Sequence, residues 1–127
     1  MSTKSVIPKP QKLKRPSTTQ GTITKIETGC GHLYVTVGKD NGNIIEVFAT
    51  LGKSGGCAKA QGEAITRSLS LGLKYGIPVE EYIKEFDNIR CPSPALDNGI
   101  QVLSCADAIA KVLKKEIAKD DKAKTDS

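Results

Sequence analysis

The sequence predicts an α+β fold in which a three-stranded antiparallel meander is followed by three helices packed on one face of the sheet. Three observations carry this prediction. Apolar residues alternate with a period of two in the first half of the chain, an Asn-Gly pair separates two of these runs, and the period changes to 3.6 residues after Gly55-Gly56. With 127 residues, of which 38% are hydrophobic, the chain has the material for one modest core.

The predicted strands are three runs rich in β-branched and aromatic residues, at positions 22–26, 33–37 and 44–49. Between the second and the third lies Asp40-Asn41-Gly42-Asn43. Asn-Gly favours a tight hairpin because both central residues tolerate a positive φ. The three runs therefore predict a meander of consecutive antiparallel strands.

The first predicted helix covers about residues 57–75 and ends at Gly76, a favourable residue just after a helix, shortly before Pro78. Its spacing puts Gln61, Ile65, Leu69 and Leu73 on the buried face, and puts the polar residues, including Ser70, toward water.

A second helix is predicted over Val79–Phe86, with its apolar stripe made of Tyr82, Ile83 and Phe86. A third opens at Ser104, where Asp107 three positions later makes an approximate capping box. Its apolar positions repeat at i, i+4 and i+8 and are Ile109, Leu113 and Ile117.

The formal net charge of +5 belongs to the start of the chain. Residues 1–19 hold five Lys and Arg and no acid, whereas residues 20–113 have nine basic residues against ten acidic ones. We expect 1–19 to be a disordered basic leader, 20–119 to be the folded domain and 120–127 to be a disordered charged tail. The leader could make weak, nonspecific contact with nucleic acid, but a solubilising role explains it as well.

The chain has no apolar run of the roughly 18 residues that a membrane helix needs, and its first residues lack the apolar segment of a secretory signal. We therefore expect a cytoplasmic protein with no membrane contact. In that compartment its four cysteines stay reduced.

The segment "LGKSGGCAKAQ", residues 51–61, raises the possibility of a phosphate-binding loop. A Walker A loop requires a glycine where this sequence has Val47, inside a predicted strand, and requires the helix directly after Gly-Lys-Ser. Here two more glycines intervene. This pattern does not favour nucleotide binding by Lys53 and Ser54.

The cysteines are more informative, although their spacing contains no Cys-x-x-Cys pair. Each falls at a predicted turn or helix entrance, whereas structural free cysteines usually lie within apolar faces. Helix N-termini also favour the thiolate, the form that binds metals. The four positions are Cys30, Cys57, Cys91 and Cys105.

Three interpretations of these cysteines remain open. The first is a closed, structural zinc site with four sulfur ligands, in which neighbouring His32 could replace one cysteine. The second is a redox pair, with Cys57 and Cys105 as the best candidates because both begin helices. The third is a set of inert thiols.

No catalytic residues are predicted. A serine-based triad would have to use His32, the one histidine, and no orienting carboxylate is indicated. The acidic pairs Glu80-Glu81 and Asp120-Asp121 are typical of solvated charges.

Five segments read together resemble the TSCPD domain, which occurs at the C-terminal end of adenosylcobalamin-dependent ribonucleotide reductases and as short free-standing chains. They are "TGCGHLYVTV", "EVFATLGKSGGCAKAQGEAITRSLSLGLKYGI", "IRCPSP", "DNG" and "LSCADAIAKVL". The resemblance covers about residues 20–115 and includes every cysteine in order. Within the name-giving motif, Leu103 and Ala106 replace Thr and Pro, while Ser104, Cys105 and Asp107 remain.

The resemblance implies a role in deoxyribonucleotide synthesis as a free-standing accessory or regulatory module, with a ribonucleotide reductase as the expected protein partner. The reductase chemistry itself needs a large barrel, a cobalamin site and a cysteine pair, for which 127 residues are too few. Two alternatives stay open: a thiol-redox shuttle for a reductase, and a nucleic-acid-binding protein that uses the basic leader.

Overall fold

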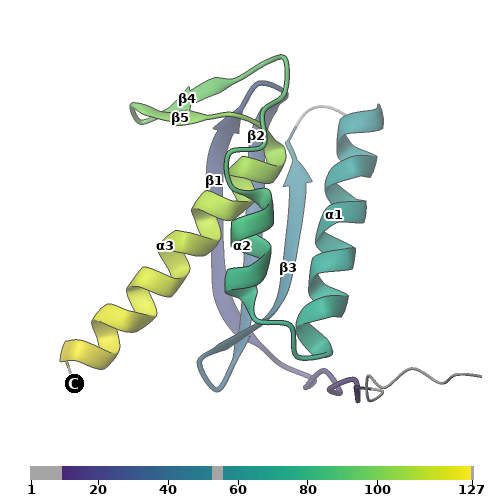
Figure 1. The fold of residues 1–127 in the computed structure, drawn as a ribbon, viewed down its shortest axis with the longest axis vertical. Coiled ribbons are helices and arrows are strands. Elements are labelled where there is room, and N and C mark those ends of the chain that lie inside the picture. Colours follow the sequence, from purple (N-terminus) through teal and green to yellow (C-terminus); the bar gives the residue numbers. More distant parts are fainter. Residues whose placement is uncertain (1–9, 53–55, 127) are drawn as a thin grey trace, which may run out of the picture.

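The computed structural model describes residues 10–52 and 56–126, with side chains as far as residue 119. Its elements follow one another as three strands, two helices, a short hairpin and a last helix (Figure 1). They are β1 (Gln20–Thr28), β2 (Gly31–Asp40), β3 (Asn43–Leu51), α1 (Gly56–Lys74), α2 (Val79–Phe86), β4 (Ala95–Asp97), β5 (Ile100–Val102) and α3 (Cys105–Asp126).

The predicted meander is confirmed: β1, β2 and β3 form one antiparallel sheet in sequence order. At the hairpin between β2 and β3, Asn41 and Gly42 have φ values of 52° and 81°. This is the pair of positive φ angles for which Asn-Gly is suited.

All three helices lie on one side of the sheet, as predicted (Figure 1). Alternate residues of the strands face them, so one set is buried and the other is more open to solvent. The core joins these strand residues to the apolar faces of the helices, with Leu33, Val35, Val37, Val47, Leu69, Leu73, Ile83, Ile109 and Leu113 among its buried members.

Helix α1 lies along the outer edge of β3, and one residue of its predicted polar face is buried there. The Ser70 hydroxyl donates a hydrogen bond to the Val47 carbonyl at 2.9 Å and accepts one from the Val47 N–H at 2.9 Å. The expectation that Ser70 faces water is thus wrong. An edge strand leaves backbone groups unpaired, and a small hydroxyl on a packed helix can satisfy them.

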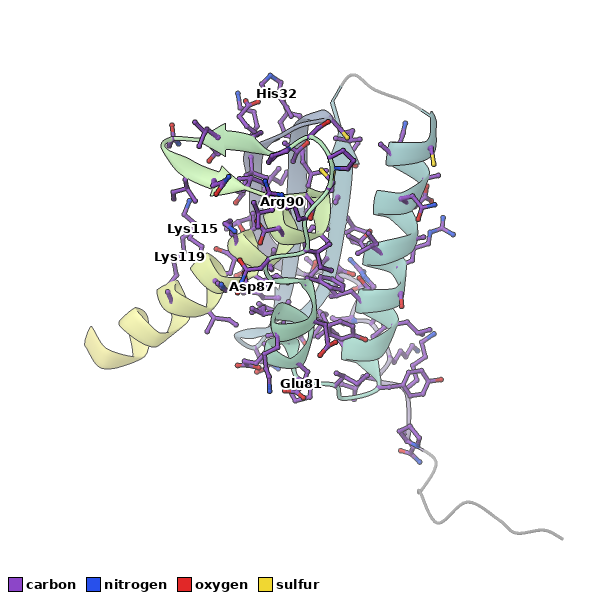
Figure 2. All side chains as sticks on the ribbon, turned by 45° about the horizontal axis from the view of Figure 1, so that its top comes forward. His32, Glu81, Asp87, Arg90, Lys115 and Lys119 are labelled. Atoms are coloured by element: carbon purple, nitrogen blue, oxygen red, sulfur yellow. The ribbon has the colours of Figure 1, made fainter. Side chains whose placement is uncertain are left out.

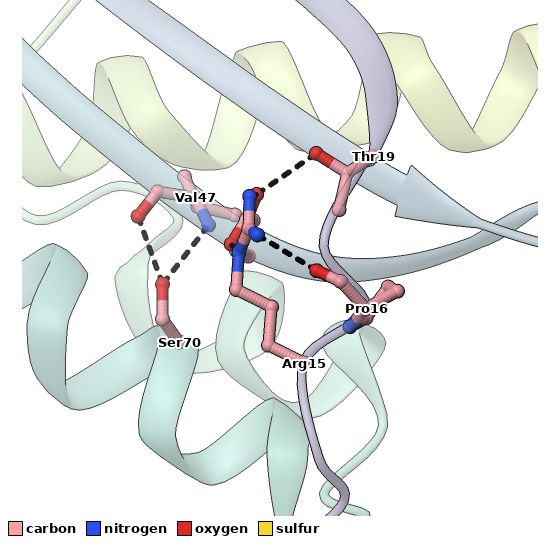
Figure 3. A network of polar contacts seen from close by, with 6 residues as sticks. Arg15, Pro16, Thr19, Val47 and Ser70 are labelled. Atoms are coloured by element: carbon pink, nitrogen blue, oxygen red, sulfur yellow. Dashed lines mark hydrogen bonds and ion pairs between the residues drawn. The ribbon is translucent and has the colours of Figure 1, made fainter.

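The first described residues lie against the domain, although we expected them to belong to a disordered leader. The Arg15 guanidinium holds both carboxylate oxygens of Glu46, with Nε to Oε1 at 2.7 Å and Nη2 to Oε2 at 3.0 Å. Figure 3 shows the same guanidinium donating to the Pro16 carbonyl at 2.8 Å. Thr19 donates a further hydrogen bond to Oε2 at 3.0 Å, and the Leu13 N–H donates to the Lys74 carbonyl. A buried carboxylate needs such partners, so it fixes this segment. Residues 1–9 lie outside the described residues.

Two further features differ from the expectation. Helix α3 continues through the expected charged tail to Asp126, since this stretch has neither Gly nor Pro to end the helix. The segment between α2 and α3 contains the hairpin β4–β5, which turns at Asn98 and Gly99 with φ values of 50° and 82°. No described helix is both long and apolar enough to cross a membrane.

Candidate cysteine site

The fold brings the segments that carry the four cysteines to one end of the molecule. Cys30 lies in the turn between β1 and β2, Cys91 in the loop after α2, Cys57 in the first turn of α1, and Cys105 begins α3. The β1–β2 turn and the N-termini of α1 and α3 all lie at the top in Figure 1, together with the β4–β5 hairpin. This end is called the cysteine end below.

Two of the cysteine loops are in direct backbone contact. A Cβ added to Gly29 would lie 1.7 Å from the carbonyl oxygen of Ser93, so the turn that holds Cys30 packs against the loop that holds Cys91 with no room for a side chain. The loop of Cys91 is also tied to the start of α3, since the Cys91 N–H donates to the Leu103 carbonyl at 2.9 Å.

The buried hydroxyl of Thr28 connects Cys30 to Cys105. It donates to the Gly31 carbonyl at 2.8 Å and accepts from the Cys30 N–H at 3.2 Å. The Cys105 thiol donates to the same oxygen, with Sγ 3.9 Å away. Sequence reasoning gave Thr28 no role, although its place at the end of a strand and two residues before a cysteine is typical of a turn-forming hydroxyl.

The thiols of Cys30, Cys91 and Cys105 share one neighbourhood. Burial raises the pKa of Cys105, the hydrogen bond with Thr28 opposes that rise, and the nearby thiols of Cys30 and Cys91 raise it further. These effects favour the neutral thiol of Cys105. A bound divalent cation inverts this preference and deprotonates its thiol ligands.

Cys57 stands apart from this group. Its side chain is exposed, and it follows residues 53–55, which lie outside the described residues together with Lys53 and Ser54 of the phosphate-loop hypothesis. Among the residues that the structure describes, no three His, Cys, Asp or Glu side chains form a group that could hold a metal ion. The donors are therefore gathered at one end without being arranged as a ligand shell.

His32, the possible substitute ligand, is engaged elsewhere. Its Nδ1 lies 2.5 Å from Glu27 Oε1, although this contact lacks the geometry of a well-directed hydrogen bond. The two residues are cross-strand partners of β1 and β2. Figure 2 shows His32 at the outermost part of the cysteine end.

The start of α3 is fixed by two residues next to Cys105. The Asp107 N–H donates to Ser104 Oγ at 3.0 Å, which confirms the predicted N-cap. The fully buried carboxylate of Asp107 accepts from the Leu103 N–H at 2.9 Å, from the Asn88 N–H at 2.8 Å and from Lys111 Nζ at 2.6 Å. Although burial opposes it, these donors hold the pKa of Asp107 below its usual value. The carboxylate thus joins the loop after α2 to α3 and sets the position of Cys105.

Comparison with known proteins finds a matching domain family and several relatives. The model of the TSCPD domain family matches residues 7–117. Similar proteins include vitamin B12-dependent ribonucleotide reductases from Agrobacterium fabrum (29% identity over 106 residues, 83% of this chain and 8% of the relative) and Streptantibioticus cattleyicolor (29% over 114 residues, 88% and 19%). That of Streptomyces clavuligerus is 31% identical over 84 residues, 65% of this chain and 9% of the relative. The chain thus spans less than a fifth of the length of these relatives, and no solved structure matches.

Proposed function

The chain belongs to the TSCPD domain family, and from this premise we propose that it is an accessory module of a vitamin B12-dependent ribonucleotide reductase whose cysteine end is held by one structural zinc ion. The ligands in this proposal are Cys30, Cys57, Cys91 and Cys105, and the compartment is the cytoplasm, where thiols stay reduced. The relatives that share the domain are reductases, which supports the choice of partner.

The observation that carries the zinc proposal is that Cys30 and Cys105 both contact Thr28, while the thiol of Cys91 lies near enough to Cys105 to raise its pKa. Several thiols brought to one place are the donors that a thiolate metal site requires. Sulfur is a preferred ligand of zinc, and a shell of four sulfurs is closed, so the ion would supply folding stability and no open position for catalysis. Cys57 is the fourth thiol of the same end and completes the set.

Metal analysis tests the zinc ion. Native mass spectrometry of protein purified without chelator should show one zinc per chain, and a chelator should remove it. Cobalt(II) in place of zinc should give the intense visible absorption of a tetrahedral thiolate site, and Cys105→Ser should reduce that absorption. Well under one zinc per chain, with all four thiols freely titratable, would overturn the metal site.

Association with the reductase is tested separately. The chain and the vitamin B12-dependent ribonucleotide reductase of the same organism should co-elute in size-exclusion chromatography. If a zinc-loaded chain does not bind the reductase, the proposed partner is overturned and the proposed metal site stands. If a chain without zinc binds the reductase, only the proposed metal site is overturned.

A thiol-redox shuttle receives less support. Such a shuttle needs a thiolate near neutral pH, and burial raises the pKa of Cys105. Alkylation rates against pH distinguish the two functions: a shuttle shows a thiol that reacts fast near pH 7, whereas a zinc site is protected until chelator is added. Nucleic-acid binding through the leader is also less favoured, because Arg15 is occupied by Glu46.

A further inference from the structure

One edge of the sheet is open along part of its length. In the order β1-β2-β3, strand β1 lies at an edge of the sheet. Thr28 and Gly31 flank the two-residue turn and face each other, so they form the first hydrogen-bonded pair between β1 and β2. The even-numbered residues of β1 bond to β2, so the N–H and C=O groups of the odd-numbered residues point outward. The Glu27 N–H confirms this, because it donates to Asp97 Oδ1 at 3.0 Å on the outer side.

Asp97 of the β4–β5 hairpin thus closes the end of this edge. The outward backbone groups of Ile23 and Lys25, the next two odd-numbered residues, make no hydrogen bond to any residue that the structure describes. Ile23 is 70% exposed, so the edge at this point is open to solvent.

The open edge borders a groove of about 370 Å³. Strand β1 forms one wall, the β4–β5 hairpin the end, and α3 the other wall. Ile26, Val102 and Val112 line it as buried core residues, and Ile100 at the hairpin, 58% exposed, supplies accessible apolar surface. The groove therefore offers both strand hydrogen bonds and apolar contacts.

The walls of the groove are basic. They contain four lysines, Lys25, Lys111, Lys114 and Lys115, against one acid, Asp97. Lys111 pairs with Asp107 and Lys114 with Asp87, whereas Lys25 and Lys115 have no ion pair with a described residue. Figure 2 shows Lys115 on the side of α3 that faces away from α1 and α2.

We propose that this groove binds an extended acidic segment of a partner protein, which adds to the sheet as a fourth strand beside β1. An unpaired strand edge is a template for an extended peptide, and the backbone supplies much of the affinity in this mode. Pairing with a second copy would bring the same groove lysines together, which disfavours it, whereas an acidic strand would meet them with opposite charge. The proposal does not depend on the metal site, which lies on other residues.

Side chains of the added strand would alternate between the two faces of the sheet. Side chains on the helix side would contact Lys111 and Lys115 of α3. Side chains on the opposite, solvent-facing side of the sheet would contact Lys25, which is exposed on that face of β1. The segment should therefore carry acidic residues at positions on both faces, with apolar residues near Ile23 and Ile100.

Selection from a random twelve-residue peptide display library against the full chain tests the specificity. Enriched peptides should be acidic and free of proline, and the double variant Lys25→Glu/Lys115→Glu should weaken their binding at least about tenfold. Lys84→Glu, a charge reversal on α2 away from the groove, should leave binding unchanged. Enriched peptides without acidic residues, no enrichment at all, or binding that is indifferent to the double variant would overturn the proposal.

Amide hydrogen exchange tests the strand pairing with a selected peptide. The outward amides of Ile23 and Lys25 should exchange fast in the free chain and be protected at least about tenfold in the complex. Lys25→Pro removes one outward N–H without removing a β1–β2 bond, and should weaken binding while the fold is kept. Peptide binding without this protection would overturn the proposal. So would a single-stranded oligonucleotide that binds as tightly as the peptide and depends on the same lysines, because the groove would then be a general anion-binding patch.

Discussion

Gly29 lies so close to the Ser93 carbonyl that a Cβ at Gly29 would be 1.7 Å from its oxygen. This contact joins the loops of Cys30 and Cys91. Gly29→Ala should therefore force the loops apart, reduce stability by about 1–3 kcal/mol and weaken metal binding at the cysteine end. Urea denaturation and cobalt(II) titration measure the two effects.

Gly62 provides the matched control. It lies in α1 with nothing within 4 Å of an added Cβ, so Gly62→Ala should raise stability by up to about 1 kcal/mol and leave metal binding unchanged. Equal behaviour of the two variants would mean that the loop contact does not constrain the cysteines.

The cap of α3 makes a second prediction. Asp107→Asn should cost about 2–4 kcal/mol, because one buried amide cannot replace a carboxylate that accepts from Leu103, Asn88 and Lys111. Ser104→Ala should cost about 1 kcal/mol through the loss of the N-cap. Ser68→Ala, at an exposed site of α1, should change stability little. Chemical denaturation in chelator separates these effects from metal loss, and an Asp107→Asn variant as stable as the parent would contradict the role of the carboxylate.

Local signals in the sequence account for most of the fold. The alternating runs, Asn41-Gly42, the Gly76 terminus and the Ser104–Asp107 cap were all identified from residue types and spacing, because each depends on near neighbours in the chain. The β4–β5 hairpin had a comparable signal in Asn98-Gly99, but its strands are only three residues long and show no clear period.

Long-range polar contacts could not be predicted in this way. Nothing local distinguishes Glu46, buried beneath Arg15, from a solvated strand residue, and nothing local shows that Ser70 meets β3. The placement of the cysteines at turns was visible in the sequence, but the meeting of Cys30, Cys91 and Cys105 depends on tertiary packing across more than 70 residues of chain. Thr28 contacts Cys30 and Cys105, and Gly29 packs against the loop of Cys91, but neither residue belongs to a recognisable sequence motif.

The contact between Arg15 and Glu46 predicts a pH dependence of stability. Hydrogen bonds from Arg15 lower the pKa of Glu46 below its usual 4.5, with burial opposing and Thr19 assisting. A carboxylate with a depressed folded pKa stabilises the fold above its unfolded pKa, and this stabilisation is lost as the pH falls through the folded pKa. Glu46→Gln should therefore destabilise the chain by about 1–2 kcal/mol at pH 7 and hardly at all near pH 2.

The same contact can be tested from the other side. Arg15→Ala should lower the thermal midpoint at pH 7 by several degrees, whereas Lys14→Ala, its exposed neighbour in sequence, should not. The double variant with Glu46→Gln should show little further loss, because both changes remove one interaction. Fully additive effects would mean that the two residues stabilise the fold independently.

The hydroxyl of Ser70 forms hydrogen bonds with two backbone groups at the edge of β3. We therefore expect its removal to reduce stability more than the removal of a typical serine hydroxyl on a helix. Ser70→Ala should leave the buried N–H and C=O of Val47 without partners and cost about 2–4 kcal/mol in denaturation experiments. Ser70→Thr keeps a hydroxyl and should recover part of that loss if the added methyl is accommodated. In hydrogen exchange, the Val47 amide of Ser70→Ala should lose protection while amides in the centre of β2 keep theirs; an unchanged Val47 amide would show that α1 covers this edge without the hydroxyl.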